Sequence, residues 1–84
     1  MENKEKLIIQ NIHIGNAIKE RLKKQNRSVV WFASQLKCSR TNVYKIFKRE
    51  SIDTQELLLV SQLLNFNFFK LYADEIAKVL KSKK

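Results

Sequence analysis

Apolar residues recur every three or four positions along most of this chain, and that spacing is typical of amphipathic helices. At the start of the pattern, Ile14, Ala17, Ile18 and Leu22 share one face, while most positions between them are polar or charged. The pattern predicts helices at about residues 14–25, 29–36, 40–48 and 54–64, and from about 68 into the tail.

Polar residues that commonly start or end helices stand at the borders of these segments. Ser28 and Ser39 are N-cap candidates, because a serine hydroxyl accepts a hydrogen bond from a free amide of the first turn. Asp53 opens a capping-box pattern, and Asn67 is placed to cap the last helix. Asn65 is suited to end the helix before it, since asparagine tolerates a positive φ.

The chain has 84 residues, which is enough for one hydrophobic core and too few for two domains. It contains no proline and one glycine, whereas hairpins and sandwiches depend on such turn residues. We therefore expect a compact all-α domain of five helices with an extended C-terminal helix. The expected boundaries are a flexible N-terminal extension at 1–11, the domain at 12–80 and a basic tail at 81–84.

The formal net charge of +9 is concentrated in the middle of the chain. Residues 19–49 contain ten Lys or Arg against one acid, Glu20, while residues 50–77 carry a net charge of −4. Such a concentration of positive charge indicates a polyanionic partner.

The segment at 40–48 would present two contrasting faces as a helix. At about 100° per residue, Val43 is central to the apolar face, and an opposite face combines cations with groups that can form hydrogen bonds to bases. Arginine and lysine donate to guanine, asparagine pairs with adenine, and a threonine methyl packs on thymine. We expect DNA base contacts in a major groove from Arg40, Thr41, Asn42, Tyr44 and Lys45. The alternative interpretation is a solvated charged face, and for Tyr44 packing within the domain remains equally open.

A second set of residues is suited to contact phosphates, which supplies affinity and salt dependence without sequence preference. Its cations flank the segment at 40–48, and its two serines add backbone amides at helix N-termini. The expected phosphate contacts are Lys23, Lys24, Arg27, Ser28, Lys37, Ser39, Lys48 and Arg49.

The stretch "SVVWFASQLKCSRTNVYKIFKR" resembles the helix-turn-helix of the Cro and lambda-repressor class, the XRE-like regulators. The following stretch, "SIDTQELLLVSQLLNFNFFKLY", is similar to the two helices that come next in that family, and together the likeness covers roughly residues 14–72. In the family a small residue and an apolar residue pack where the two helices cross, and Ala33 and Val43 hold those positions here. The resemblance implies a lambda-repressor-like fold and a small DNA-binding transcriptional regulator, most plausibly a repressor.

The resemblance also carries over to individual positions. The positions from which the family usually contacts bases match Arg40, Thr41 and Lys45, and common phosphate-contacting positions match Ser39 and Lys48. One position departs from the family: the turn residue, usually glycine, is Lys37. Either Lys37 adopts a positive φ, which is costly for a residue with a Cβ, or the turn differs.

The helix at 54–64 contains more apolar residues than one buried face requires, since Leu59 and Leu63 add to Leu57, Leu58, Val60 and Leu64. Excess apolar surface in a small domain suggests self-association, and DNA-binding proteins of this kind commonly form two-fold dimers. We expect a homodimer interface from Leu59, Leu63, Phe69, Tyr72, Ile76 and Val79.

A second class of function stays open: a protein-binding module of the same fold, such as an antitoxin or a bridging factor. Its partner would be a toxin or the transcription machinery, bound through the helices at 54–64 and beyond 68. The two classes differ in whether Arg40 or the apolar surface is essential, and an antitoxin could use both.

Other chemistries have little support. No candidate nucleophile has a base nearby in sequence, so we expect no enzyme activity. His13 has no second ligand at metal-binding spacing, and we expect neither metal nor cofactor. Cys38 is the only cysteine, which excludes an intramolecular disulfide, and no apolar run is long enough to span a membrane, so we expect a cytoplasmic protein. Trp31 and the aromatic residues at 66–72 are better explained as core or subunit contacts than as a platform for single-stranded bases.

Overall fold

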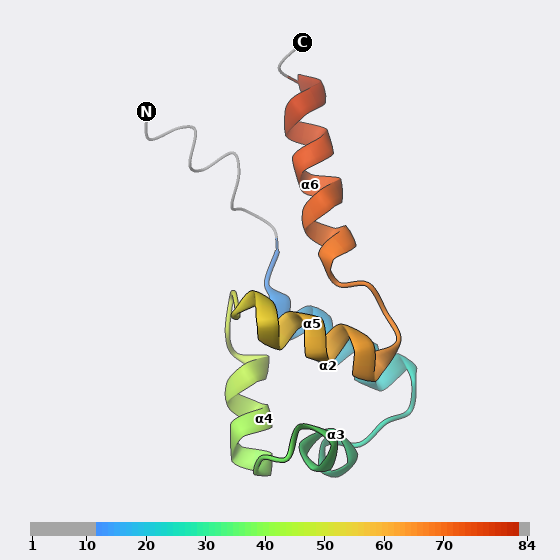
Figure 1. The fold of residues 1–84 in the computed structure, drawn as a ribbon, viewed down its shortest axis with the longest axis vertical. Coiled ribbons are helices and arrows are strands. Elements are labelled where there is room, and N and C mark those ends of the chain that lie inside the picture. Colours follow the sequence, from blue (N-terminus) through green and yellow to red (C-terminus); the bar gives the residue numbers. More distant parts are fainter. Residues whose placement is uncertain (1–11, 83–84) are drawn as a thin grey trace.

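A computed structural model of the chain describes residues 12–82, and over that range the chain is all-helical, which confirms the predicted fold class. The helices are α2 (Ile14–Lys24), α3 (Val29–Leu36), α4 (Arg40–Phe47), α5 (Thr54–Leu64) and α6 (Phe69–Ser82) (Figure 1). The first four begin at the residues that the sequence predicts. Helix α6 continues two residues past the predicted domain end at 80, into the segment expected as a basic tail. The expected extension at 1–11 lies outside the described residues.

The core is formed by apolar side chains from α2 to α5, together with one residue that precedes α6. Its buried members are Ile14, Ile18, Leu22, Phe32, Ala33, Val43, Ile46, Phe47, Leu57, Val60, Leu64 and Phe68. The expectation that Leu58 points inward is wrong, because 48% of it is exposed. Its neighbour Leu57 lies on the buried face of α5, and adjacent helix positions are about 100° apart.

Side-chain caps start the helices where the sequence places them. The Ser28 and Ser39 hydroxyls each accept from the amide three residues further on, at 3.0 and 3.2 Å. Asp53 Oδ1 accepts from the amide two residues on at 2.6 Å, and Asn67 Oδ1 does the same at 3.0 Å. The sequence did not predict the cap of α2, where His13 Nδ1 accepts from the amide three residues on at 3.1 Å. Each cap satisfies an amide that the helix itself leaves without an acceptor.

Three helices are followed, within two residues of their ends, by a non-glycine residue with a positive φ: Asn26 (56°), Lys37 (58°) and Asn65 (53°). After each helix, two amides turn back to carbonyls of its last turn. For α5 these bonds run from Asn65 to Gln62 and from Phe66 to Ser61, at 3.3 and 3.0 Å. This is the Schellman arrangement, which usually employs glycine. The left-handed conformation predicted for Asn65 is confirmed.

The first turn of α2 is joined by its backbone to the segment that follows α4. The amides of Ile14 and Gly15 donate to the carbonyls of Glu50 and Arg49, at 3.1 and 3.0 Å. These two amides belong to the first turn of a helix and have no acceptor within it. The loop after α4 supplies those acceptors and fixes α4 against α2.

Gly15 permits this close approach because it has no Cβ. A Cβ at Gly15 would lie 2.6 Å from the carbonyl carbon of Phe47, and closer still to the carbonyl oxygens of Ile46 and Phe47. Those atoms are backbone and cannot rotate away. Gly15 is fully enclosed, and its φ is not positive, so close packing rather than an unusual conformation requires glycine here.

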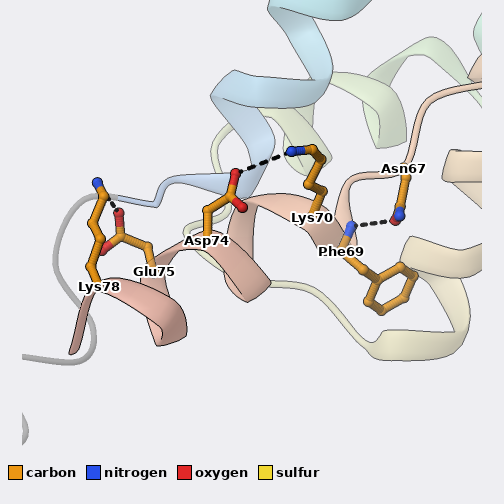
Figure 2. A network of polar contacts seen from close by, with 6 residues as sticks. All are labelled: Asn67, Phe69, Lys70, Asp74, Glu75 and Lys78. Carbon is orange, nitrogen blue, oxygen red and sulfur yellow. Dashed lines mark hydrogen bonds and ion pairs between the residues drawn. The ribbon is translucent and has the colours of Figure 1, made fainter. Parts of the chain in front are cut away.

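Helix α6 begins against the core and then extends away from the other helices (Figure 1). At its start Phe68 is fully buried, and the Phe68 amide donates to the Ser61 hydroxyl at 3.3 Å. Further on, α6 has the local support of a solvent-exposed helix (Figure 2). Lys70 Nζ lies 3.6 Å from Asp74 Oδ2, and Lys78 Nζ lies 3.2 Å from Glu75 Oε2. Such pairs each contribute roughly 0.2–0.5 kcal/mol.

Replacing Gly15 with alanine tests the close crossing of α2 and α4. Alanine in a helix normally stabilises by about 0.5–1 kcal/mol relative to glycine. At Gly15 we expect the reverse, a loss of about 1–2 kcal/mol in the free energy of unfolding, because overpacking costs typically 1–3 kcal/mol. Urea denaturation followed by circular dichroism measures this free energy of unfolding. The neighbouring exposed position supplies a control, Asn16→Ala, which should change stability by less than about 0.5 kcal/mol. If Gly15→Ala stabilises the domain, the backbones of α2 and α4 do not approach each other this closely.

Candidate nucleic-acid interface

Helix α4 has one buried face and one exposed face. Val43, Ile46 and Phe47 are buried, with at most 8% of each residue exposed. All five residues expected to contact bases are exposed: Arg40, Thr41, Asn42, Tyr44 and Lys45. The three-and-four spacing of the apolar positions places residues 41 and 45 on the side of α4 opposite residue 43, whereas Arg40 is exposed because it is the first residue of the helix.

Two neighbouring helices hold the buried face of α4. Helix α2 contacts its C-terminal end at Gly15, and α3 precedes it across a turn of three residues, 37–39. In Figure 1 α3 is seen almost end-on whereas α4 runs upright, so the chain changes direction sharply at this turn. Ala33 and Val43 are both buried in the same core cluster. Helix α4 therefore projects its outer face from a fixed base.

The turn keeps its left-handed residue although the position is not glycine. Lys37 has φ 58° and ψ 47°. Its amide donates to Ser34 O at 3.2 Å, and the Cys38 amide donates to Ala33 O at 3.0 Å. Of the two possibilities that the sequence left open, the structure has the positive φ. This conformation costs roughly 1–2 kcal/mol for a residue with a Cβ. The two hydrogen bonds and the α3–α4 packing offset that cost.

The residues expected to contact phosphates all lie on the surface. Exposed are Lys23, Lys24, Arg27, Ser28, Lys37, Ser39, Lys48 and Arg49. Among the described residues, no carboxylate forms an ion pair with any of the ten cations at 19–49. The ion pairs within residues 12–82 join side chains of α6. The positive charge of this segment is therefore available to a partner rather than neutralised by the chain's own acids.

Two arginines of the cationic segment stack on aromatic rings. The guanidinium carbon of Arg27 lies 4.2 Å from the centroid of the Trp31 ring, and that of Arg21 lies 3.8 Å from the Phe66 ring. Sequence reasoning missed both contacts. Arg27 precedes the N-cap Ser28, so its spacing of four residues from Trp31 is not a helical spacing and gave no signal. No local pattern connects Arg21 with Phe66.

Tyr44 is partly packed against the domain and partly exposed. Its ring packs edge-on against the Phe47 ring, with centroids 6.1 Å apart and 81° between the planes, while 52% of the residue is exposed. It borders a hollow of about 340 Å³ between α2 and α4, lined by His13, Asn16, Lys19, Tyr44, Phe47 and Lys48. Tyr44 is thus anchored to the domain and accessible at the edge of the exposed face.

The residues expected in a dimer interface differ in exposure. Leu59 and Ile76 are exposed, at 43% and 56%. Partly buried are Leu63, Phe69, Tyr72 and Val79, of which the first three pack against the domain's own core. Burial raises the pKa of Tyr72 above its usual value of 10.0. Two exposed leucines outside the expected set, Leu58 and Leu80, enlarge the apolar surface of α5 and α6.

Among residues 12–82, no three His, Cys, Asp or Glu side chains lie close enough together to hold a metal ion. In the same part of the chain, none of the helices has both the length and the apolar character needed to cross a membrane. Comparison of the chain with protein-family models, curated proteins and solved structures gave no match.

Replacing Lys37 tests the turn before α4. Glycine adopts a positive φ without a Cβ penalty, so Lys37→Gly should raise the free energy of unfolding by about 1 kcal/mol. Lys37→Ala removes the same charge but keeps a Cβ, and we expect it to leave stability within about 0.5 kcal/mol of the original chain. Urea denaturation of both variants makes the comparison. If glycine destabilises the domain more than alanine does, the turn is not left-handed.

Proposed function

We propose that this protein is a sequence-specific double-stranded DNA-binding regulator, most plausibly a repressor, whose helix α4 enters the major groove. One observation carries the proposal: Thr41 and Lys45 are exposed on the side of α4 opposite buried Val43, and Arg40 is exposed beside them at the N-terminal end of the helix. The resemblance to XRE-like regulators supports the same function. Without it, the geometry and charge still favour a nucleic-acid partner.

The diameter of α4 and the residues at its N-terminal end suit a major groove. An α-helix with its side chains is about 10–12 Å in diameter, and the major groove is about 12 Å wide, so α4 can enter it. Residues at the N-terminal end of such a helix reach base edges first, which gives Arg40, Thr41 and Asn42 the central role. Arg40 would donate to guanine and Asn42 would pair with adenine, each contributing roughly 1–3 kcal/mol of discrimination.

The surrounding cations would supply affinity. Each phosphate neutralised releases condensed counterions, so the logarithm of the binding constant falls with the logarithm of the salt concentration by roughly 0.9 per contact. Lys23 and Lys24 end α2, Arg27 precedes α3, and Lys48 and Arg49 follow α4, and all five are exposed. Such exposed cations are suited to contact the phosphates that border a groove.

We propose that two copies act together through the exposed apolar residues of α5 and α6. A two-fold dimer would place two α4 helices about one DNA turn, roughly 34 Å, apart and would bind a near-palindromic site. Helix α6 is suited to this role because it extends from the core and keeps Ile76 and Leu80 exposed.

A second function is favoured by the same apolar surface. Leu58, Leu59, Ile76 and Leu80 are exposed on the two C-terminal helices, as expected of a module that binds a different protein. An antitoxin or a bridging factor would use this surface. Such a protein would recover a stoichiometric partner in affinity purification and would keep its activity when Arg40 is replaced.

Two single substitutions distinguish base contacts from phosphate contacts. The test begins with selection of bound sites from a random duplex library at about 0.15 M salt. Arg40→Ala should relax preference at one base position, at a cost of about 1–3 kcal/mol for the selected site. Lys24→Ala should weaken binding to all sequences about equally and reduce the salt slope by about one. Equal competition by every duplex would refute the proposed function.

The proposed dimer is tested by sedimentation at high micromolar concentration. Ile76→Asp places a charge on the exposed apolar face of α6 and should convert the dimer to monomer without unfolding the domain, because Ile76 is 56% exposed. Lys81→Asp is the matched control, since residue 81 lies about 140° around the same helix. A monomeric original chain would contradict the dimer.

A further inference from the structure

We propose that Trp31 is a positioning residue for the DNA interface: its ring holds the Arg27 guanidinium ready to bind a phosphate. The inference rests on the proposed function and adds to it a residue outside the contact sets predicted from the sequence. It begins with the 4.2 Å separation between the Arg27 guanidinium carbon and the centre of the Trp31 ring.

Trp31 is itself firmly placed. Its amide donates to the Ser28 hydroxyl at 3.0 Å, so the residue belongs to the capped first turn of α3. Its ring stacks on the ring of Phe32, with centroids 6.5 Å apart and 20° between the planes. Phe32 is fully buried in the core. The surface under Arg27 is therefore connected to the rigid part of the domain.

Stacking leaves the hydrogen-bonding groups of an arginine free. The guanidinium is planar, and it contacts an aromatic ring through its face, whereas its five N–H donors point outward in the plane. Arg27 is exposed and forms no ion pair with a carboxylate of the described residues. Held on Trp31, it can donate to a phosphate with less loss of side-chain freedom than an unrestrained arginine would suffer.

The second arginine–aromatic pair provides a contrast within the same domain. Arg21 stacks on Phe66, whose ring packs edge-on against that of Phe68 at 4.8 Å between centroids. Arg21 is partly buried, and this pair joins α2 to the connection between α5 and α6. It serves the packing of the domain. Arg27 instead is exposed just before the N-cap of α3, and α3 is joined to α4 by the turn at 37–39.

The test is a double-mutant cycle on binding to a duplex with the original chain, Arg27→Gln, Trp31→Leu and the double variant. Arg27→Gln should reduce the salt slope by about one, because one phosphate contact is lost. Trp31→Leu should weaken binding to every duplex about two- to fivefold while keeping the slope, because the charge remains and only its placement is lost. Trp31→Phe, which keeps an aromatic face, should restore most of the affinity. In the Arg27→Gln background, Trp31→Leu should have no further effect.

Arg21→Gln is the control, because it also removes one positive charge and one ring contact, and we expect it to leave the salt slope unchanged. Trp31 is the only tryptophan, so its fluorescence provides a readout without DNA: Arg27→Gln should shift the emission, whereas Arg21→Gln should not.

An equal loss of affinity on Trp31→Leu with and without Arg27 would overturn the inference, as would unchanged emission in Arg27→Gln. If all duplexes compete equally, sequence reading fails, but the double-mutant cycle still decides the role of Trp31, because phosphate contacts carry no sequence information.

Discussion

The contact between Gly15 and the end of α4 is the constraint on which the rest of the structure depends. Two amides of α2 bind carbonyls of the loop after α4, and no side chain fits between the two backbones. A helix held at one end by backbone and joined at the other to α3 by a three-residue turn has little freedom to move. Its outer face is therefore presented in a fixed orientation, which base recognition requires because a bidentate pair depends on geometry.

The charge distribution gives this scaffold its second property. Ten cations lie between residues 19 and 49 with one acid among them, and among the described residues none is paired with a carboxylate. Repulsion between these charges opposes folding, and the twelve buried apolar residues of the core offset it. On the proposed function, DNA relieves the repulsion, so that binding stabilises the folded domain by mass action.

Much of the fold was predictable because its signals are local. Ser28, Ser39 and Asp53 mark helix starts within one turn of the amides that they cap, and the apolar spacing of α4 is enough to separate Val43 from Thr41 and Lys45. Two of the contacts that the sequence did not reveal join distant residues. Gly15 meets Phe47 across 32 positions, and Arg21 reaches Phe66 across 45. The capping role of His13 was missed because histidine is an uncommon cap, and Leu58 was misplaced because a leucine-rich run obscures the period.

Arg40 on α4 is proposed to read a base in the major groove, and a duplex with an altered guanine probes this contact. Replacing one guanine of the selected site with 7-deazaguanine removes the N7 acceptor from the major groove and leaves base pairing intact. We expect one guanine position at which this change weakens binding of the original chain and has no effect on binding of the Arg40→Ala variant. Equal losses in both proteins, or no sensitive guanine anywhere in the site, would contradict it.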